Sequence, residues 1–134
     1  MTSGPSESEK ENASHDLADA IERRNFARAE RLARTLNRPR AEIRDFQEKA
    51  FRQFVVELRN PQGAIALARE FNFTEEDVDH LLTSILQEAK LAEQEGAVEY
   101  RRRFDMKTKR YLDLKEWIRE YFKSRKWKQG QKTA

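Results

Sequence analysis

The chain has no cysteine, only four glycines and three prolines, and no long apolar run among its 134 residues. The absence of cysteine excludes disulfide bonds, thiolate metal ligands and cysteine nucleophiles. No segment approaches the roughly 18 consecutive apolar residues of a membrane-spanning helix, and the first residues lack the apolar core of a secretory signal. We therefore expect a soluble cytoplasmic protein with no membrane contact.

Charged residues are abundant. Asp, Glu, Lys and Arg make up 38% of the chain, and hydrophobic residues make up 37%. With so few glycines and prolines, these charges must lie on the outer faces of regular elements rather than in loops. That composition is typical of a helical protein. The length suits one domain that buries at most about 70% of the surface of its unfolded chain.

The charges are distributed unevenly along the chain. Residues 1–100 carry 14 basic and 20 acidic residues, whereas residues 101–134 carry 13 basic and 4 acidic ones. Within the first part, residues 70–99 hold nine acidic residues and a single lysine. Any function must account for an acidic segment that is directly followed by a basic one.

An internal repeat relates residues 24–51 to residues 59–86 at an offset of 35. Seven pairs are identical: Arg24/Arg59, Asn25/Asn60, Ala29/Ala64, Leu32/Leu67, Ala33/Ala68, Arg34/Arg69 and Asn37/Asn72. A third, degenerate copy is expected at an offset of 33, with its apolar positions at Ala97, Tyr100, Phe104, Tyr111, Leu114 and Ile118. A period near 35 is typical of helical hairpins, and each hairpin buries its apolar face only against a neighbour.

Apolar residues recur at intervals of three and four from Asp16 onward, which predicts alternating short and long helices. Asn60-Pro61 is a favourable helix start, and residues 74–77 match a capping box. The Ser- and Glu-rich residues 1–15 are expected to be disordered. We predict an all-α fold without strands: about three stacked helical hairpins, as a small right-handed α-α superhelix or an orthogonal bundle. This single domain is expected over residues 16–127, followed by a flexible basic tail at residues 128–134.

Two segments resemble known families. Residues 18–39, ADAIERRNFARAERLARTLNRP, are similar to the second half of a tetratricopeptide hairpin, which implies paired helices and a scaffold role. Residues 46–82, which end in NPQGAIALAREFNFTEEDVDHLL, resemble the helical domain of nitrogen-fixation-associated leader peptides. Those peptides continue into a glycine-rich processing site that this chain does not contain.

The repeat also has the spacing of a helix-turn-helix. Each copy places a small residue, a turn asparagine and a β-branched residue in register, as in Ala68, Asn72 and Val78. Asparagine, like glycine, tolerates the left-handed turn. However, the would-be recognition helix of the second copy starts with acidic residues at 75–77, which DNA phosphates would repel. In the first copy Glu42 and Asp45 lie among the better placed Arg40 and Arg44. Reading of DNA by these hairpins therefore ranks below the other hypotheses.

Asp77, His80 and Ser84 could share one helix face. A catalytic relay would also need an oxyanion site, and a di-iron site would need a second histidine-bearing helix. The sequence offers neither. We interpret these residues as a solvated polar face, and we expect no catalytic residue, no metal and no cofactor.

Basic and aromatic residues alternate in the C-terminal segment, which is how proteins grip phosphate backbones and unpaired bases. An ordinary buried stripe would explain the aromatic residues, but it explains the excess of positive charge poorly. Trp127 lies beyond the repeat pattern and is the residue most suspected of binding. The candidate binding residues are Arg101, Arg102, Arg103, Lys107, Lys109, Arg110, Lys123, Arg125, Lys126, Trp127 and Lys128.

Three hypotheses of function follow from this pattern. The first is a noncatalytic protein-interaction module whose basic C-terminal helix meets an acidic surface of a partner protein. The second is a nucleic-acid-binding protein that grips RNA or single-stranded DNA through the same basic, aromatic helix. The third is self-association, in which the acidic surface at residues 70–99 meets the basic surface at residues 101–128 of another copy. An enzyme ranks last, and the first hypothesis is favoured because hairpin stacks serve mainly as binding scaffolds.

Overall fold

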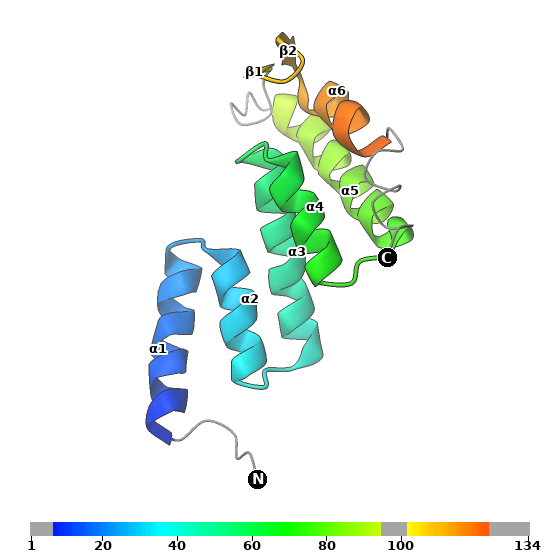
Figure 1. The fold of residues 1–134 in the computed structure, drawn as a ribbon. Coiled ribbons are helices and arrows are strands. Elements are labelled where there is room, and N and C mark those ends of the chain that lie inside the picture. Colours follow the sequence, from blue (N-terminus) through cyan, green and yellow to red (C-terminus); the bar gives the residue numbers. More distant parts are fainter. Residues whose placement is uncertain (1–6, 95–101, 124–134) are drawn as a thin grey trace. The chain divides into compact units, whose positions relative to one another are not determined.

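Helices account for most of the chain, as the computed structural model shows for residues 7–94 and 102–123 (Figure 1). The expected all-α class with helical hairpins is confirmed. The elements in chain order are α1 (Glu7–Glu22), α2 (Phe26–Thr35), α3 (Arg40–Val56), α4 (Pro61–Glu70), α5 (Glu75–Gln94), β1 (Arg103–Asp105), β2 (Arg110–Leu112), α6 (Leu114–Ile118) and a π-helical turn, η2 (Arg119–Lys123). None of the helices in these two ranges is long and apolar enough to cross a membrane.

The internal repeat reappears in the backbone with the same offset of 35. The helices α2 and α4 each have ten residues, and their first residues, Phe26 and Pro61, are one repeat apart. The longer helices α3 and α5 begin at Arg40 and Glu75, which are also one repeat apart. The predicted alternation of short and long helices is therefore confirmed for both copies.

The repeated asparagines form the helix boundaries. The side chains of Asn25 and Asn60 accept hydrogen bonds from the backbone N–H of the third residue of α2 and α4, at 3.3 and 2.9 Å. This contact satisfies one of the donors that a helix start leaves unpaired. Asn37 and Asn72 lie just after the ends of the same helices with φ of 53° and 56°, the left-handed conformation that asparagine tolerates.

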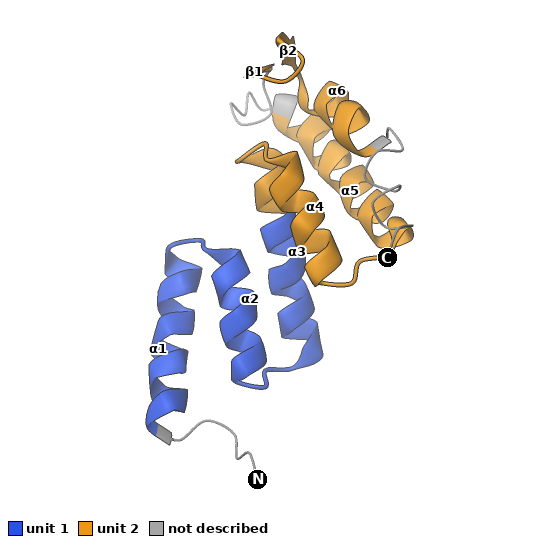
Figure 2. Ribbon diagram, in the orientation of Figure 1, with its two compact units in different colours: residues 1–51 blue, residues 52–134 orange. Residues whose placement is uncertain are grey.

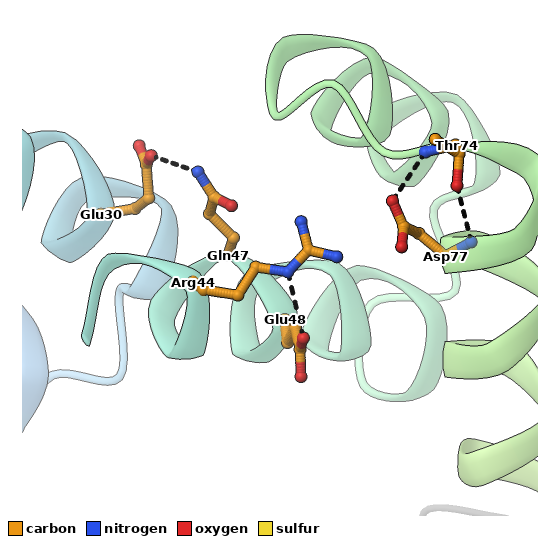
Figure 3. A network of polar contacts seen from close by, with 6 residues as sticks. All are labelled: Glu30, Arg44, Gln47, Glu48, Thr74 and Asp77. Atoms are coloured by element: carbon orange, nitrogen blue, oxygen red, sulfur yellow. Dashed lines mark hydrogen bonds and ion pairs between the residues drawn. The ribbon is translucent and has the colours of Figure 1, made fainter. Parts of the chain in front are cut away.

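The predicted capping box at the start of α5 is also confirmed (Figure 3). Asp77 N–H donates to the Thr74 hydroxyl at 3.0 Å, and Thr74 N–H donates to the Asp77 carboxylate at 2.9 Å. The Asp77 carboxylate thus caps the start of α5.

The chain divides into two compact units, residues 1–51 and 52–134, which are described separately (Figure 2). In the first unit, α1 packs on α2, and the core contains Leu17, Ala20, Ala29, Ala33 and Phe46. In the second unit, α5 contacts α6. The buried residues there include Leu67 and Leu81, whose burial the repeat predicted, together with Leu112, Leu114, Trp117, Ile118 and Phe122. The expectation of one domain over residues 16–127 stays a prediction.

The first helix begins earlier than expected. We predicted disorder up to residue 15, but α1 starts at Glu7. Ala13, Leu17 and Ala20 are buried on one side of this helix, at intervals of four and three residues. We predicted disorder from the low average hydrophobicity of this segment, but these buried residues lie on one side of the helix, which packs on α2.

The expectation that the fold has no strands is wrong, and residues 103–112 of the expected third copy are not helical. Residues 103–112 form an antiparallel β-hairpin in which Phe104 lies opposite Tyr111, and both side chains are exposed. The turn of this hairpin is stabilised by Asp105, whose carboxylate accepts the Thr108 N–H at 2.9 Å, and by Lys109 at φ 59°. The later positions of the expected copy, Leu114 and Ile118, are buried in α6 as predicted. Its first positions, Ala97 and Tyr100, lie outside the described residues, as does the expected tail at 128–134.

Candidate binding site

A cleft of about 600 Å³ lies within the second unit. Its walls are the loop between α3 and α4 with the first turns of α4, the strand β1 with its turn, and the side chains of Trp117 and Tyr121. Ligand pockets in proteins typically measure about 300–1,000 Å³, so this cleft has room for a small molecule or a few side chains of a partner.

Two arginines of the cleft are fixed at the C-terminal end of α3. Arg59 has a left-handed backbone, and its Nε donates to the carbonyl of Val56 at 3.3 Å. Arg103, on β1, donates from Nη1 to the carbonyl of Glu57 at 2.6 Å. The last carbonyls of a helix have no partner within the helix and carry partial negative charge, which favours cations there. The end of α3 thus holds both guanidinium groups beside the cleft.

The electrostatic environment of Arg59 is unusual for an arginine. Burial and the positive charge of Arg103 lower the pKa of Arg59 to about 10, while Asp113 acts in the opposite direction. Arg59 still carries its charge at neutral pH. An anion placed beside the two guanidinium groups would reduce their mutual repulsion and offset the cost of burying Arg59.

The carboxylate of Asp105 is engaged within the protein. It accepts the Tyr121 hydroxyl at 2.7 and 2.8 Å, in addition to the Thr108 N–H. Burial acts to raise the pKa of Asp105, but these hydrogen bonds outweigh burial and lower it below its usual value. Burial, and then the contact with Asp105, raise the pKa of Tyr121. Tyr121 therefore stays protonated and donates to a carboxylate that stays ionised.

The aromatic rings of the cleft are covered by cations and by one another. The guanidinium of Arg59 lies 5.9 Å from the centre of the Trp117 ring, and the Lys107 ammonium lies 5.5 Å from the centre of the Tyr121 ring. The two rings are 5.3 Å apart. These contacts hold the cations in place by their attraction to the ring faces.

The structure brings only part of the predicted binding residues together. Arg103 and Lys107 line the cleft. Arg102, Lys109 and Arg110 are exposed outside its lining, and Arg102 lies 3.9 Å from Glu116. Lys123 ends η2. Arg101, Arg125, Lys126, Trp127 and Lys128 lie outside the described residues, so their role stays a prediction, as does self-association through residues 70–99 and 101–128.

The basic segment also differs in shape from what we expected, since residues 103–112 form a β-hairpin and not part of a helix. Arg59 and Arg69 were missed as site residues. Both are identities of the repeat, and we interpreted them as part of the packing pattern. Their separation from the C-terminal basic segment by more than thirty residues left no local signal that could connect the two groups.

No metal site was found in the part of the chain that the structure describes. Comparison of the chain with protein-family models, curated proteins and solved structures gave no match. The resemblances to tetratricopeptide hairpins and to leader peptides therefore stay predictions.

Proposed function

We propose that this chain is a noncatalytic binding module and that the cleft binds an acidic segment of a partner protein. The observation that carries the proposal is the convergence of four cations on one cavity: Arg59, Arg69, Arg103 and Lys107. Asp105 is the one carboxylate among the described residues that line it, and that carboxylate already accepts two donors. The excess of positive charge favours an anionic ligand.

The same contacts support a binding role over a catalytic one. A general base must be free to accept a proton from the substrate, and a nucleophile must be activated. Asp105 has a lowered pKa and is hydrogen-bonded, whereas Tyr121 has a raised pKa and keeps its proton. Neither group is suited to start a reaction at neutral pH.

The proposal can be tested by fluorescence anisotropy with a labelled acidic peptide of eight residues, EESEESEE. Lys107→Gln should weaken binding by about threefold, because an exposed ion pair contributes roughly 0.2–1 kcal/mol. Arg110→Gln is the matched control, since it removes the same charge from the same hairpin at a residue that does not line the cleft. Equal losses for the two variants would mean that the peptide senses only net charge, and the cleft would be rejected as the site.

A second candidate function, binding of single-stranded nucleic acid, is favoured by two exposed aromatic rings of the β-hairpin. Phe104 and Tyr111 lie opposite each other there, with ring centres 5.2 Å apart, and Arg110 is adjacent. Exposed rings beside basic residues are suited to stack on bases. Phe104 also lines the cleft but Tyr111 does not, so a substitution of Tyr111 tests this surface separately.

Titration with mixed-sequence RNA and single-stranded DNA at about 50 and about 200 mM salt tests this second candidate. If it is correct, binding weakens steeply with salt, and Tyr111→Ala reduces the affinity for nucleic acid while leaving the acidic peptide unaffected. A wild-type chain that binds neither nucleic acid at the lower salt concentration would eliminate it.

A further inference from the structure

Apolar side chains are exposed at the rim of the cleft. Leu58, Phe104 and Met106 line it and are 56%, 46% and 69% exposed. Single exposed apolar residues are normal, but three around one cavity form an apolar surface that a ligand can cover. Leu58 follows α3, while Phe104 and Met106 belong to the β-hairpin and its turn, so the apolar residues lie on both walls.

The apolar rim and the cations belong to the same walls. Leu58 is adjacent to Arg59 in the chain, and Phe104 and Met106 alternate with Arg103, Asp105 and Lys107. A ligand that is only acidic would leave the rim exposed to water, and a ligand that is only apolar would make no charged contact with the cations. The lining is therefore complementary to a ligand that carries both kinds of group.

The state of the aromatic rings favours a peptide over a nucleic acid in this cleft. Trp117 is only 2% exposed, and the rings of Trp117 and Tyr121 already pack on each other and on the cations Arg59 and Lys107. A base needs an open ring on which to stack. The most exposed apolar groups at the rim, Leu58 and Met106, are aliphatic, and a methionine side chain adapts to apolar groups of different shape.

From these observations we infer that the cleft recognises a short amphipathic acidic segment, in which a large apolar side chain is adjacent to carboxylates. The carboxylates lie beside Arg59, Arg103 and Lys107, and the apolar side chain packs on Leu58 and Met106. This inference rests on the proposed function and specifies its ligand. The volume of about 600 Å³ limits the bound part to a few side chains.

Two peptides of equal charge and length test the inference: EELEELEE and EESEESEE, each labelled for fluorescence anisotropy. We expect the leucine peptide to bind about fivefold more tightly, because partial burial of one leucine at the rim adds apolar stabilisation. The difference should persist at about 500 mM salt, where the charge contribution common to both peptides is screened.

Variants of the cleft separate the two contributions. Met106→Ser should lower the affinity for the leucine peptide by about threefold without changing the affinity for the serine peptide. Lys107→Gln should lower the affinity for both peptides by the same factor. Leu91→Ser is the control, since it removes an exposed apolar side chain that does not line the cleft, and it should change neither affinity. The melting temperature of each variant confirms that it is folded.

The outcomes distinguish the inference from the proposed function. If neither peptide binds the wild-type chain, the proposed function fails, and the inference fails with it. If both peptides bind equally well and Met106→Ser has no effect, the acidic ligand stands but the apolar requirement is refuted. If mixed-sequence RNA displaces the leucine peptide and its own binding depends on Met106, the cleft is a nucleic-acid site and the inference is wrong.

Discussion

The buried contact between Glu30 and Gln47 joins two positions that are apolar residues in the second copy of the repeat. Glu30 is fully buried, and its carboxylate accepts a hydrogen bond from Gln47 Nε2 at 3.0 Å (Figure 3). It also accepts one from Arg34 Nε. One repeat later, at an offset of 35, the corresponding residues are Ile65 and Leu82. The same pair of positions is thus polar in the first copy and apolar in the second.

This correspondence predicts the outcome of a double-mutant cycle. Gln47→Leu removes one donor from a buried carboxylate and should lower the free energy of unfolding by about 1–3 kcal/mol. Glu30→Ile should cost about 1 kcal/mol or less, since the half-buried Gln47 amide can turn to water. The double variant should be at least as stable as the wild type, because replacing a buried charged contact by apolar residues is often neutral or stabilising.

Urea unfolding of the four proteins, followed by far-ultraviolet circular dichroism, measures the coupling between the two substitutions. We expect a coupling free energy of about 1–3 kcal/mol in favour of the double variant. Glu48→Gln is the control, because the ion pair of Glu48 with Arg44, at 3.2 Å, is partly exposed and should contribute within about 0.5 kcal/mol. Additive single effects, or a double variant less stable than either single one, would refute the reasoning.

Leu67 and Leu81 are buried, so Leu→Ala at either position should lower the free energy of unfolding by about 2–5 kcal/mol. Urea unfolding curves that stay close to the wild-type curve for both variants would contradict the role of the repeat in packing. Gly63→Ala should destabilise the chain by about 1–3 kcal/mol despite the better helix propensity of alanine, because the added methyl group would lie 2.6 Å from a phenylalanine ring; an unchanged or raised melting temperature would show that the ring moves aside. Tyr121→Phe removes a donor to Asp105, whose pKa is lowered in the folded state. The stabilisation from this hydrogen bond is complete above the pKa of Asp105 in the unfolded chain, near 4, and is lost as the pH falls below it. The stability difference between wild type and Tyr121→Phe should therefore shrink as the pH falls from about 5 to about 2. A difference that does not depend on pH would exclude this linkage.

The sequence by itself determined the boundaries of the repeated helices. Asn25, Asn60 and the capping box at residues 74–77 act on backbone groups three residues away. The left-handed turns at Asn37 and Asn72 close the same helices through bonds to their last residues. Interactions of such short range depend on neighbouring residues alone, and they can therefore be identified in the sequence.

Only the tertiary structure decided the form of residues 103–112. The apolar spacing of Phe104, Tyr111, Leu114 and Ile118 matched a helix of the repeat, but it also fits a β-hairpin followed by a short helix. Which of the two forms is adopted depends on distant contacts, since the Tyr121 hydroxyl donates a hydrogen bond to Asp105, sixteen residues away in the chain. The prediction of a helix failed because local periodicity does not contain that contact.

The cleft likewise depended on tertiary structure. Arg103 reaches the carbonyl of Glu57 across 46 positions of the chain, and this places it beside Arg59. The sequence showed that positive charge is concentrated near the C-terminus, since charge is a sum over residues. It did not show which of these charges would lie together beside Arg59 and Trp117, because that depends on how β1 and α6 pack against the end of α3 and the start of α4.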